Sequence, residues 1–325
     1  MSTVLTSRSA VYLKQQPALP VPPDGFVETN KAVLVVPIFS KLKTNRMSGQ
    51  MNTQDEFIDL CNSKAAFNVG TDLRATGTAK MDKAPEYAEL IKVCGFRLPA
   101  SPVADTYELV NDTDGVPHGS ALVFVDDNEF KFTNTLVGAL TANFEIGKPA
   151  NIEVALSGYI DSEIPVNTPN PVPVLNTAKA LIVSCLDIVT VGGTVIPAEK
   201  VVIKTNPKIA ETYTMGGTNG MKDNTITDYS LTLDITFPVD KTKYAEAAMA
   251  IRSGTVSALR VIIGADSAGK PVDGESVLIT ADLAKATAYT DSDKNGLLDR
   301  TLSFRLFNGN GSPAMRWLTG KIAGL

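Results

Sequence analysis

The sequence has few of the residue types on which most enzyme active sites depend. Its 325 residues include one histidine, His118, and three cysteines, Cys61, Cys94 and Cys185. A Ser-His-Asp or Cys-His site would have to use His118, which lies in a segment of turn composition with no nucleophile beside it. We therefore expect no catalytic residue and no enzyme activity.

Positive charge is not in excess either. The chain has 30 Lys and Arg residues against 35 Asp and Glu residues, a formal net charge of −5. Proteins that grip phosphates over a wide surface rely on Lys and Arg to displace counterions. The charge balance thus argues against a nucleic-acid-binding protein of that kind.

Signals for export, membrane insertion or disulfide bonding are also missing. The three cysteines lie far apart with no Cys-x-x-Cys pair, and no run of 18 apolar residues occurs. The first residues contain no basic region followed by an apolar stretch. We expect reduced thiols, no membrane partner and assembly in a cytoplasm.

What the sequence does contain is short stretches of alternating apolar and polar residues. Segment 229–237 alternates in this way, and so do 140–146 and 152–156, which flank the turn at Gly147. These patterns predict a mainly β fold with a long hairpin over 140–158. Helices are expected to be short: one over 54–63 after a capping box, and one over 85–95.

Proline-rich tracts suggest a division of the chain. One tract ends near Gly25, and a second spans 164–173 and should be a stiff connector. We expect an extended N-terminal arm over 1–31, a first β domain over 32–162, a linker over 163–174 and a second β domain over 175–325.

An internal repeat supports this division. Tyr87-Ala88-Glu89 recurs as Tyr244-Ala245-Glu246, at the start of a second predicted helix over 243–253. In each half, an alternating strand (69–79 and 229–237) precedes the helix, and a hairpin follows it (140–158 and 277–309). Chance similarity between short β-rich segments is the alternative, but the order of elements favours duplication.

Two loops resemble ligand-binding motifs. Segment 291–299 places oxygen-bearing residues and Gly296 as in a calcium-binding EF-hand loop, but Leu302 stands where the bidentate Glu belongs and the flanks read as strands. We expect an ordinary turn there, with calcium as the alternative.

Segment 215–221 is glycine-rich but lacks the Gly-Lys-Ser/Thr ending of a phosphate loop. No metal ligand and no cofactor are predicted.

Residues 84–160 contain three notable features: a helix that closes in Cys94-Gly95-Phe96, the segment Phe144-Glu145-Ile146-Gly147-Lys148-Pro149-Ala150, and a strand that ends at Ser157-Gly158. In these features the segment resembles the tail tube (major tail) proteins of long-tailed, non-contractile bacteriophages. The second half resembles the family less distinctly, and the N-terminal arm and residues 40–68 depart from it. What the resemblance implies is two tandem β-sandwich or barrel tube domains, each flanked by a short α-helix and carrying a long β-hairpin.

The implied function is structural. Copies of the chain would form rings that stack into the tail tube of a virion, beside the tape measure protein and other tail proteins, and DNA would pass through the lumen without specific binding. Since such rings commonly contain six tube domains, a duplicated chain should form a homotrimer with pseudo-sixfold symmetry. A hexamer with one half on the outside is the alternative.

Two further expectations and two rival functions stay open. Some of the four residues Asn143, Glu145, Asn151 and Glu153 are predicted to face the lumen, where like charge would repel DNA. Trp317 either anchors the C-terminal segment to a neighbour or closes its own core. The rival functions are a calcium-stabilised β-sandwich module that binds receptors or glycans, and a tube protein of a contractile tail or secretion apparatus.

Overall fold

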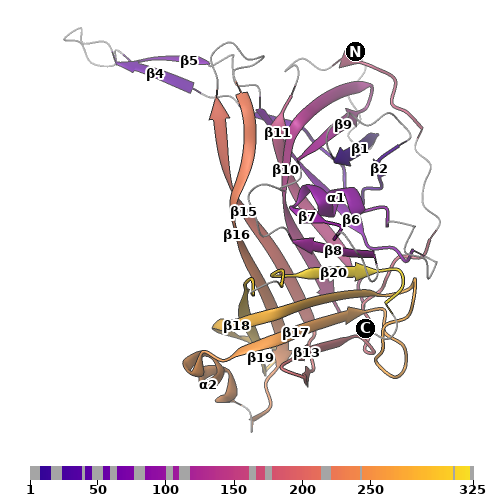
Figure 1. Cartoon of the computed structure of the whole chain (residues 1–325), viewed down its shortest axis with the longest axis vertical. Helices are drawn as coiled ribbons and strands as arrows, with labels where there is room; N and C mark the ends of the chain where they lie inside the picture. The colour runs from indigo at the N-terminus through magenta and orange to yellow at the C-terminus, as the bar shows by residue number, and fades with distance from the viewer. Residues whose placement is uncertain are drawn as a thin grey trace.

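The structure is a computed structural model, and it is mainly β, as predicted. It describes residues 8–15, 24–38, 41–45, 54–58, 64–76, 85–99, 105–109, 118–160, 166–172, 178–213, 221–241, 244–309 and 312–322. Strands account for 62% and helices for 6% of the described residues. Figure 1 shows one large antiparallel sheet with two short helices, and a small separate hairpin formed by β4 and β5.

The first half of the chain contains twelve labelled strands and one helix. They are β1 Ser9–Gln15, β2 Phe26–Val27, β3 Val36–Ile38, β4 Lys41–Asn45, β5 Gln54–Ile58, β6 Lys64–Asp72, α1 Ala88–Val93, β7 Phe96–Arg97, β8 Asp105–Leu109, β9 Gly119–Val125, β10 Asn128–Glu145, β11 Asn151–Tyr159 and β12 Val166–Asn167.

The second half contains eight labelled strands and one helix. They are β13 Ile188–Val191, β14 Thr194–Ile196, β15 Lys200–Tyr213, β16 Met221–Pro238, α2 Glu246–Ser253, β17 Val256–Ile263, β18 Val277–Lys294, β19 Leu297–Leu306 and β20 Arg316–Thr319. The predicted hairpins correspond to β10–β11 and β18–β19, and both pair along their length.

The same succession of strand pairings occurs twice along the chain. In the first half it runs β6–β11–β10–β9–β1–β2, and in the second β16–β19–β18–β17–β13–β14. β12 pairs with the start of β10, as β20 pairs with the start of β18. Each half thus contains the same order of neighbours, and the agreement is closer than the repeated Tyr-Ala-Glu motif alone would indicate.

The register of the two halves agrees as well. Across the first half, Val69 lies opposite Val154, which lies opposite Leu140. Across the second, Ile235 lies opposite Leu302, which lies opposite Tyr289. These two rows of residues occupy equivalent positions. Residues of the paired strands in one half can therefore be matched with residues in the other by following the pairings out from these rows.

Strands from the two predicted domains pair directly with each other. Residues 141–145 of β10 pair with 200–204 of β15, and β8 pairs with β20. One hydrophobic cluster includes buried residues of both halves. The halves therefore share a sheet and a main core, and the finer prediction of two separate sandwich or barrel domains is not confirmed.

Trp317 closes the core of its own chain. It lies on β20 with no exposed surface, and its ring centroid is 6.3 Å from those of both Tyr87 and Phe144. Tyr87 and Phe144 belong to the first half. Of the two roles left open for Trp317, the structure therefore supports packing within the chain.

The predicted arm and linker need correction. Residues 9–15, assigned to an N-terminal arm, form β1, which pairs with β9 along seven residues and buries Val11 and Leu13. Its four consecutive apolar residues, 10–13, are all buried, so both faces of this strand are covered and it belongs to the core. Part of the proline-rich linker likewise pairs as β12 with β10, while Val172 is 89% exposed. Residues 163–165 and 173–174 of the predicted linker lie outside the described residues.

The helices at 85–95 and 243–253 are found as α1 and α2, but the helix predicted over 54–63 is wrong. Residues 54–58 form β5, which pairs with β4. Cross-strand pairing outweighs a local capping signal here, since helix propensity is a weak prior. The strand predicted over 69–79 runs instead over 64–72. Neither α1 nor α2 is long and apolar enough to cross a membrane.

Candidate functional site

The long sheet has a polar face, which lies opposite the core. On β10, buried Leu140, Ala142 and Phe144 alternate with residues of the other face. Residues directly opposite one another on paired strands project to the same side. The registers therefore place the following residues together on the polar face: Thr141, Asn143, Glu145, Asn151, Glu153, Lys200, Lys204, Thr232, Asp234, Thr236, Thr290, Ser292, Asp299, Thr301 and Ser303.

The four residues predicted to line a lumen all lie on this polar face. Asn143 and Asn151 are directly opposite each other, and the Asn143 Nδ2 donates to the Asn151 Oδ1 at 3.3 Å. Glu145 and Glu153 are partly exposed on the same face. The structure thus brings the four residues together on one face of the sheet.

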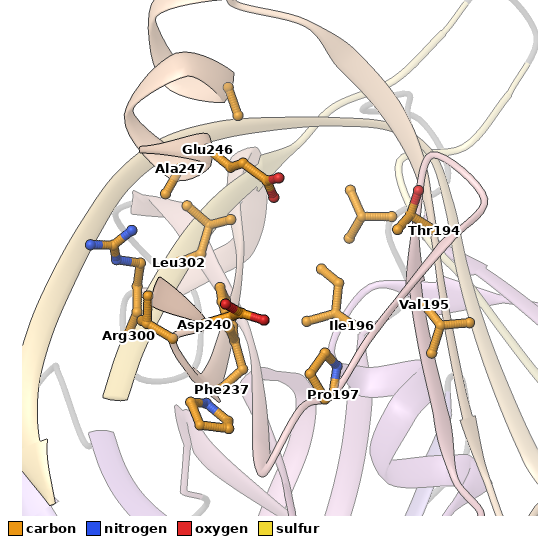
Figure 2. Close-up of a pocket in the computed structure, with 14 residues that line it drawn as sticks. Thr194, Val195, Ile196, Pro197, Phe237, Asp240, Glu246, Ala247, Arg300 and Leu302 are labelled. Carbon is orange, nitrogen blue, oxygen red and sulfur yellow. The ribbon is translucent and has the colours of Figure 1, made fainter. Parts of the chain in front are cut away.

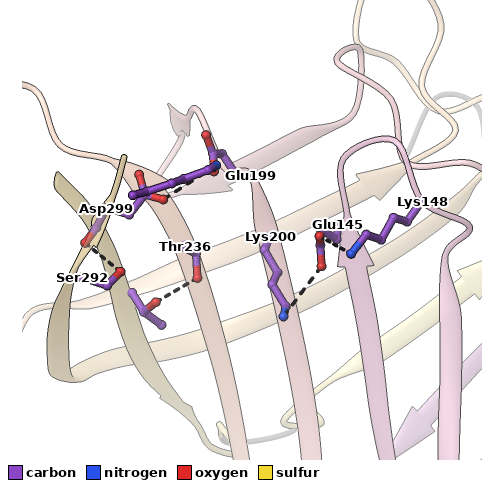
Figure 3. A network of polar contacts seen from close by, with 9 residues as sticks. Glu145, Lys148, Glu199, Lys200, Thr236, Ser292 and Asp299 are labelled. Carbon is purple, nitrogen blue, oxygen red and sulfur yellow. Dashed lines mark hydrogen bonds and ion pairs between the residues drawn. The ribbon is translucent and has the colours of Figure 1, made fainter. Parts of the chain in front are cut away.

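Lysines offset the acidic residues of the polar face (Figure 3). The Lys148 Nζ lies 2.5 Å and the Lys200 Nζ 3.8 Å from the Glu145 carboxylate, and the hydrogen bond from Lys148 holds the pKa of Glu145 below its usual range. Lys294 contacts Glu199 and lies 3.8 Å from Asp299. The face is therefore polar and mixed in charge, and like-charge repulsion is weaker than the four residues alone suggest.

The ends of the repeated sheet are two open edges. β10 pairs with β15 through 141–145, and the register makes 290–294 of β18 the equivalent stretch in the second half. In the described part of the chain, β19 is the only strand that pairs with 290–294. The counterpart of β15 in the first half is the segment 32–38, which includes β3 and pairs with β6.

Apolar side chains are exposed at both of these edges. Leu34, Val36 and Ile38 are 54%, 58% and 45% exposed, and Tyr289 on β18 is 41% exposed. An edge strand with exposed apolar residues invites pairing with another strand. We name the stretch 290–294 the β18 edge and the stretch 32–38 the β3 edge.

The calcium-like loop at 291–299 is the end of a hairpin. Asn295 and Gly296 both have positive φ, at 54° and 85°, as a two-residue hairpin turn requires. The Asp293 Oδ1 accepts from the Gly296 N–H at 3.0 Å. The backbone of this loop is therefore that of a tight hairpin turn.

Asp291, the first ligand position of that loop, is held by an arginine. The Arg300 guanidinium donates to both Asp291 oxygens, at 2.6 and 2.9 Å, and this hydrogen bonding lowers the pKa of Asp291. Arg300 is almost fully buried and stacks on the rings of Tyr244 and Tyr289. In the described residues, no group of three or more His, Cys, Asp and Glu side chains could hold a metal ion.

Calcium should therefore leave the stability of the protein unchanged. Because the Asp291 carboxylate is engaged by Arg300 and position 302 is a leucine, the loop lacks two of its carboxylate ligands. We expect the melting temperature in millimolar calcium to equal that in chelator, for the wild type and for Asp293→Ala alike. A calcium-dependent rise that Asp293→Ala abolishes would contradict this.

The histidine and the cysteines lie in different surroundings. His118 is partly buried just before β9, and burial raises the pKa of the Cys94 thiol, which lies in the core after α1. Cys185 is exposed. Cys61 and the glycine-rich segment before Met221 lie outside the described residues.

A groove of about 380 Å³, not predicted from the sequence, opens beside α2 (Figure 2). Its walls come from α2, β14, β19 and the end of β16, and Ile196 and Glu246 point toward the space between them. The lining is mainly apolar and includes Phe237, Val239, Ala247 and Leu302. We call it the α2 groove.

Neither a known protein-family model nor a curated protein sequence matches this chain.

Proposed function

We propose that the chain is a structural protein that assembles into rings and that stacked rings form a tube, as in the bacteriophage tail tubes that its sequence resembles. The observation that carries the proposal is the repeated order of strand pairings. Among the described residues, the β18 edge and the β3 edge are unpaired on the side where their counterparts, β10 and β15, pair with each other. No chemistry is needed for this role.

The contact between β10 and β15 supplies the pattern for a contact between copies. Thr141 lies opposite Lys204, and the register makes Thr290 and Val36 their respective counterparts. Thr290 of one copy would thus lie opposite Val36 of the next. The β18 edge of each copy pairs with the β3 edge of its neighbour, and the sheet continues from copy to copy.

Such a contact is head-to-tail, and repeated rotation either closes it into a ring or extends it into a filament. Each chain contributes two equivalent sets of strands, joined by a contact that imitates the one between copies. Three copies then complete a ring in which six sets are related by pseudo-sixfold symmetry. The alternative remains a hexamer in which only one half of each chain forms the ring.

The polar face would form the inner wall of the tube. Its strands carry Thr, Ser and Asn side chains together with paired charges such as Glu145 with Lys200. A wall without a net excess of lysine and arginine offers no array of cations to hold phosphates, so DNA can pass without being bound. The core side of the sheet, with α1 and α2, then faces outward.

Imaging of the assembled protein tests this function. Negative-stain micrographs of the purified chain, alone and with its tail partners, are expected to show rings or tubes with an open centre. A reconstruction should place Asn143 and Glu153 on the inner surface, with three chains in each ring. A strictly monomeric protein under all these conditions, or all four predicted lumen residues on the outside, would contradict the proposal.

The two rival functions make different demands. A calcium-stabilised receptor- or glycan-binding module needs a working metal loop, and the Asp291–Arg300 pair counts against this. The tube of a contractile tail or secretion apparatus requires the same ring, so a sheath protein encoded beside this one would favour it.

A further inference from the structure

Residues 181–183, which belong to the second half, lie across the turn of the β10–β11 hairpin in the first half. This is the position in the first half that corresponds to the α2 groove. The Leu181 N–H donates to the Leu73 carbonyl, and the Ala150 N–H donates to the Leu181 carbonyl, both at 2.8 Å. Val183 continues along the hairpin turn, where its N–H donates to the Lys148 carbonyl at 3.0 Å. Leu181 and Val183 are buried and belong to the main core cluster.

The second half has the same scaffold, but nothing described lies across it. The Leu73 N–H donates to the Ala150 carbonyl at 2.8 Å, and the equivalent Val239 N–H donates to the Leu298 carbonyl at 2.9 Å. Ala150 is fully buried, whereas Leu298 is 37% exposed and its neighbour Leu297 is 67% exposed. The α2 groove opens beside Val239. In the part of the chain that the structure describes, this apolar position is therefore uncovered.

The repeat indicates which residues correspond to 181–183 in the other half of the chain. Residues 181–183 precede β13 by a few residues, and β1 is the counterpart of β13. Val11 on β1 lies opposite Val123, and Val189 on β13 lies opposite Val261. Counting back equally from Val11 and from Val189 matches 181–183 with Thr3, Val4 and Leu5.

A second copy must supply this segment. Figure 1 shows β1, which begins shortly after Leu5, at the opposite end of the molecule from α2. Residues 1–7 themselves lie outside the described residues. In a ring built from equivalent contacts, the half that follows the second half of one copy is the first half of the next.

We propose that residues 3–5 of one copy cross between Val239 and Leu298 of its neighbour and cover the α2 groove. The Leu298 N–H then donates to the Thr3 carbonyl, as Ala150 does to Leu181. Leu5 takes the place of Val183 and packs against the apolar lining of the groove. Val4, like Ile182, which is 52% exposed, points away from it. The proposal rests on the ring proposed above and names a contact that holds it together.

Two single substitutions in the full-length chain test the contact. Leu5→Asp places a charge in an apolar groove, while Val4→Asp places the same charge at a position expected to be exposed. Amide hydrogen exchange of Leu298 is measured in free and in assembled protein. We expect assembly to slow exchange at Leu298 at least tenfold in the wild type and in Val4→Asp. Leu5→Asp is expected either to fail to assemble or to assemble without this protection.

The outcomes separate this contact from the proposed function. Rings that form while Leu298 exchanges as in the free protein would overturn the docking of residues 3–5 and leave the tube function standing. Protection that survives Leu5→Asp unchanged would overturn it too. If neither the wild type nor Val4→Asp forms rings under any condition, both the docking and the tube function are wrong.

Discussion

Oxidation of assembled protein that carries cysteines at positions 290 and 36 is expected to give covalent species of up to three chains and none larger. Thr290 and Val36 are the counterparts of Thr141 and Lys204, which lie opposite each other where β10 pairs with β15. The Leu140 N–H donates to the Thr205 Oγ1 on β15, so the N–H of Thr141 points away from β15. Thr141 and Lys204 thus form a non-hydrogen-bonded pair, whose Cα atoms lie about 4.5 Å apart and suit a disulfide.

The chain offers a matched control for this experiment. Cysteines at 141 and 204 should form a disulfide within one chain, with the same geometry, whether or not the protein assembles. Both pairs are made in a background in which Cys61 and exposed Cys185 are replaced by serine. Non-reducing gels then count the chains in a ring. Cross-linked species of up to six chains would refute the trimer. An efficient 141–204 disulfide without any disulfide between 290 and 36 would show that the contact between copies does not match the β10–β15 contact.

The sequence was sufficient to predict the local elements that its patterns describe. Alternation over 229–237 and around Gly147 predicted strands that are present, because one face of each strand has to be buried. The helices followed from apolar stripes that end at Gly95 and Gly254, both of which have positive φ. The strand at 54–58 was missed because its pairing with β4 depends on residues outside the segment.

The partners of each element could not be predicted in the same way. The repeat indicated two equivalent halves, but not that β10 pairs with β15 or that Trp317 packs on Tyr87. Likewise, alternation placed Glu145 on the polar face, while its neutralising contact with Lys200 arises from pairing between distant strands. The α2 groove is formed by elements that are separated in sequence, so no local pattern marks it.

The shared core leads to the second large effect, on stability. Replacing Trp317 with alanine is expected to lower the free energy of unfolding by about 3–5 kcal/mol, because a fully buried indole is removed and a cavity remains. Since Trp317 lies on β20 while its ring partners Tyr87 and Phe144 belong to the first half, the loss should weaken both halves. Melting of the variant is therefore expected as one cooperative transition at lower temperature than in the wild type.

Calorimetry of the unassembled chain measures this effect, and two variants serve as controls. Val172→Ala truncates a side chain that is 89% exposed and should change the unfolding free energy by no more than about 0.5 kcal/mol. Trp317→Phe keeps an aromatic ring between Tyr87 and Phe144 and should cost less than alanine. Two separate transitions, of which Trp317→Ala shifts only the one assigned to the second half, would show that the halves unfold independently. In that case the β8–β20 and β10–β15 pairings would be too weak to couple the unfolding of the two halves. The β10–β15 contact, which is our pattern for the contact between copies, would then not by itself hold two sets of strands together.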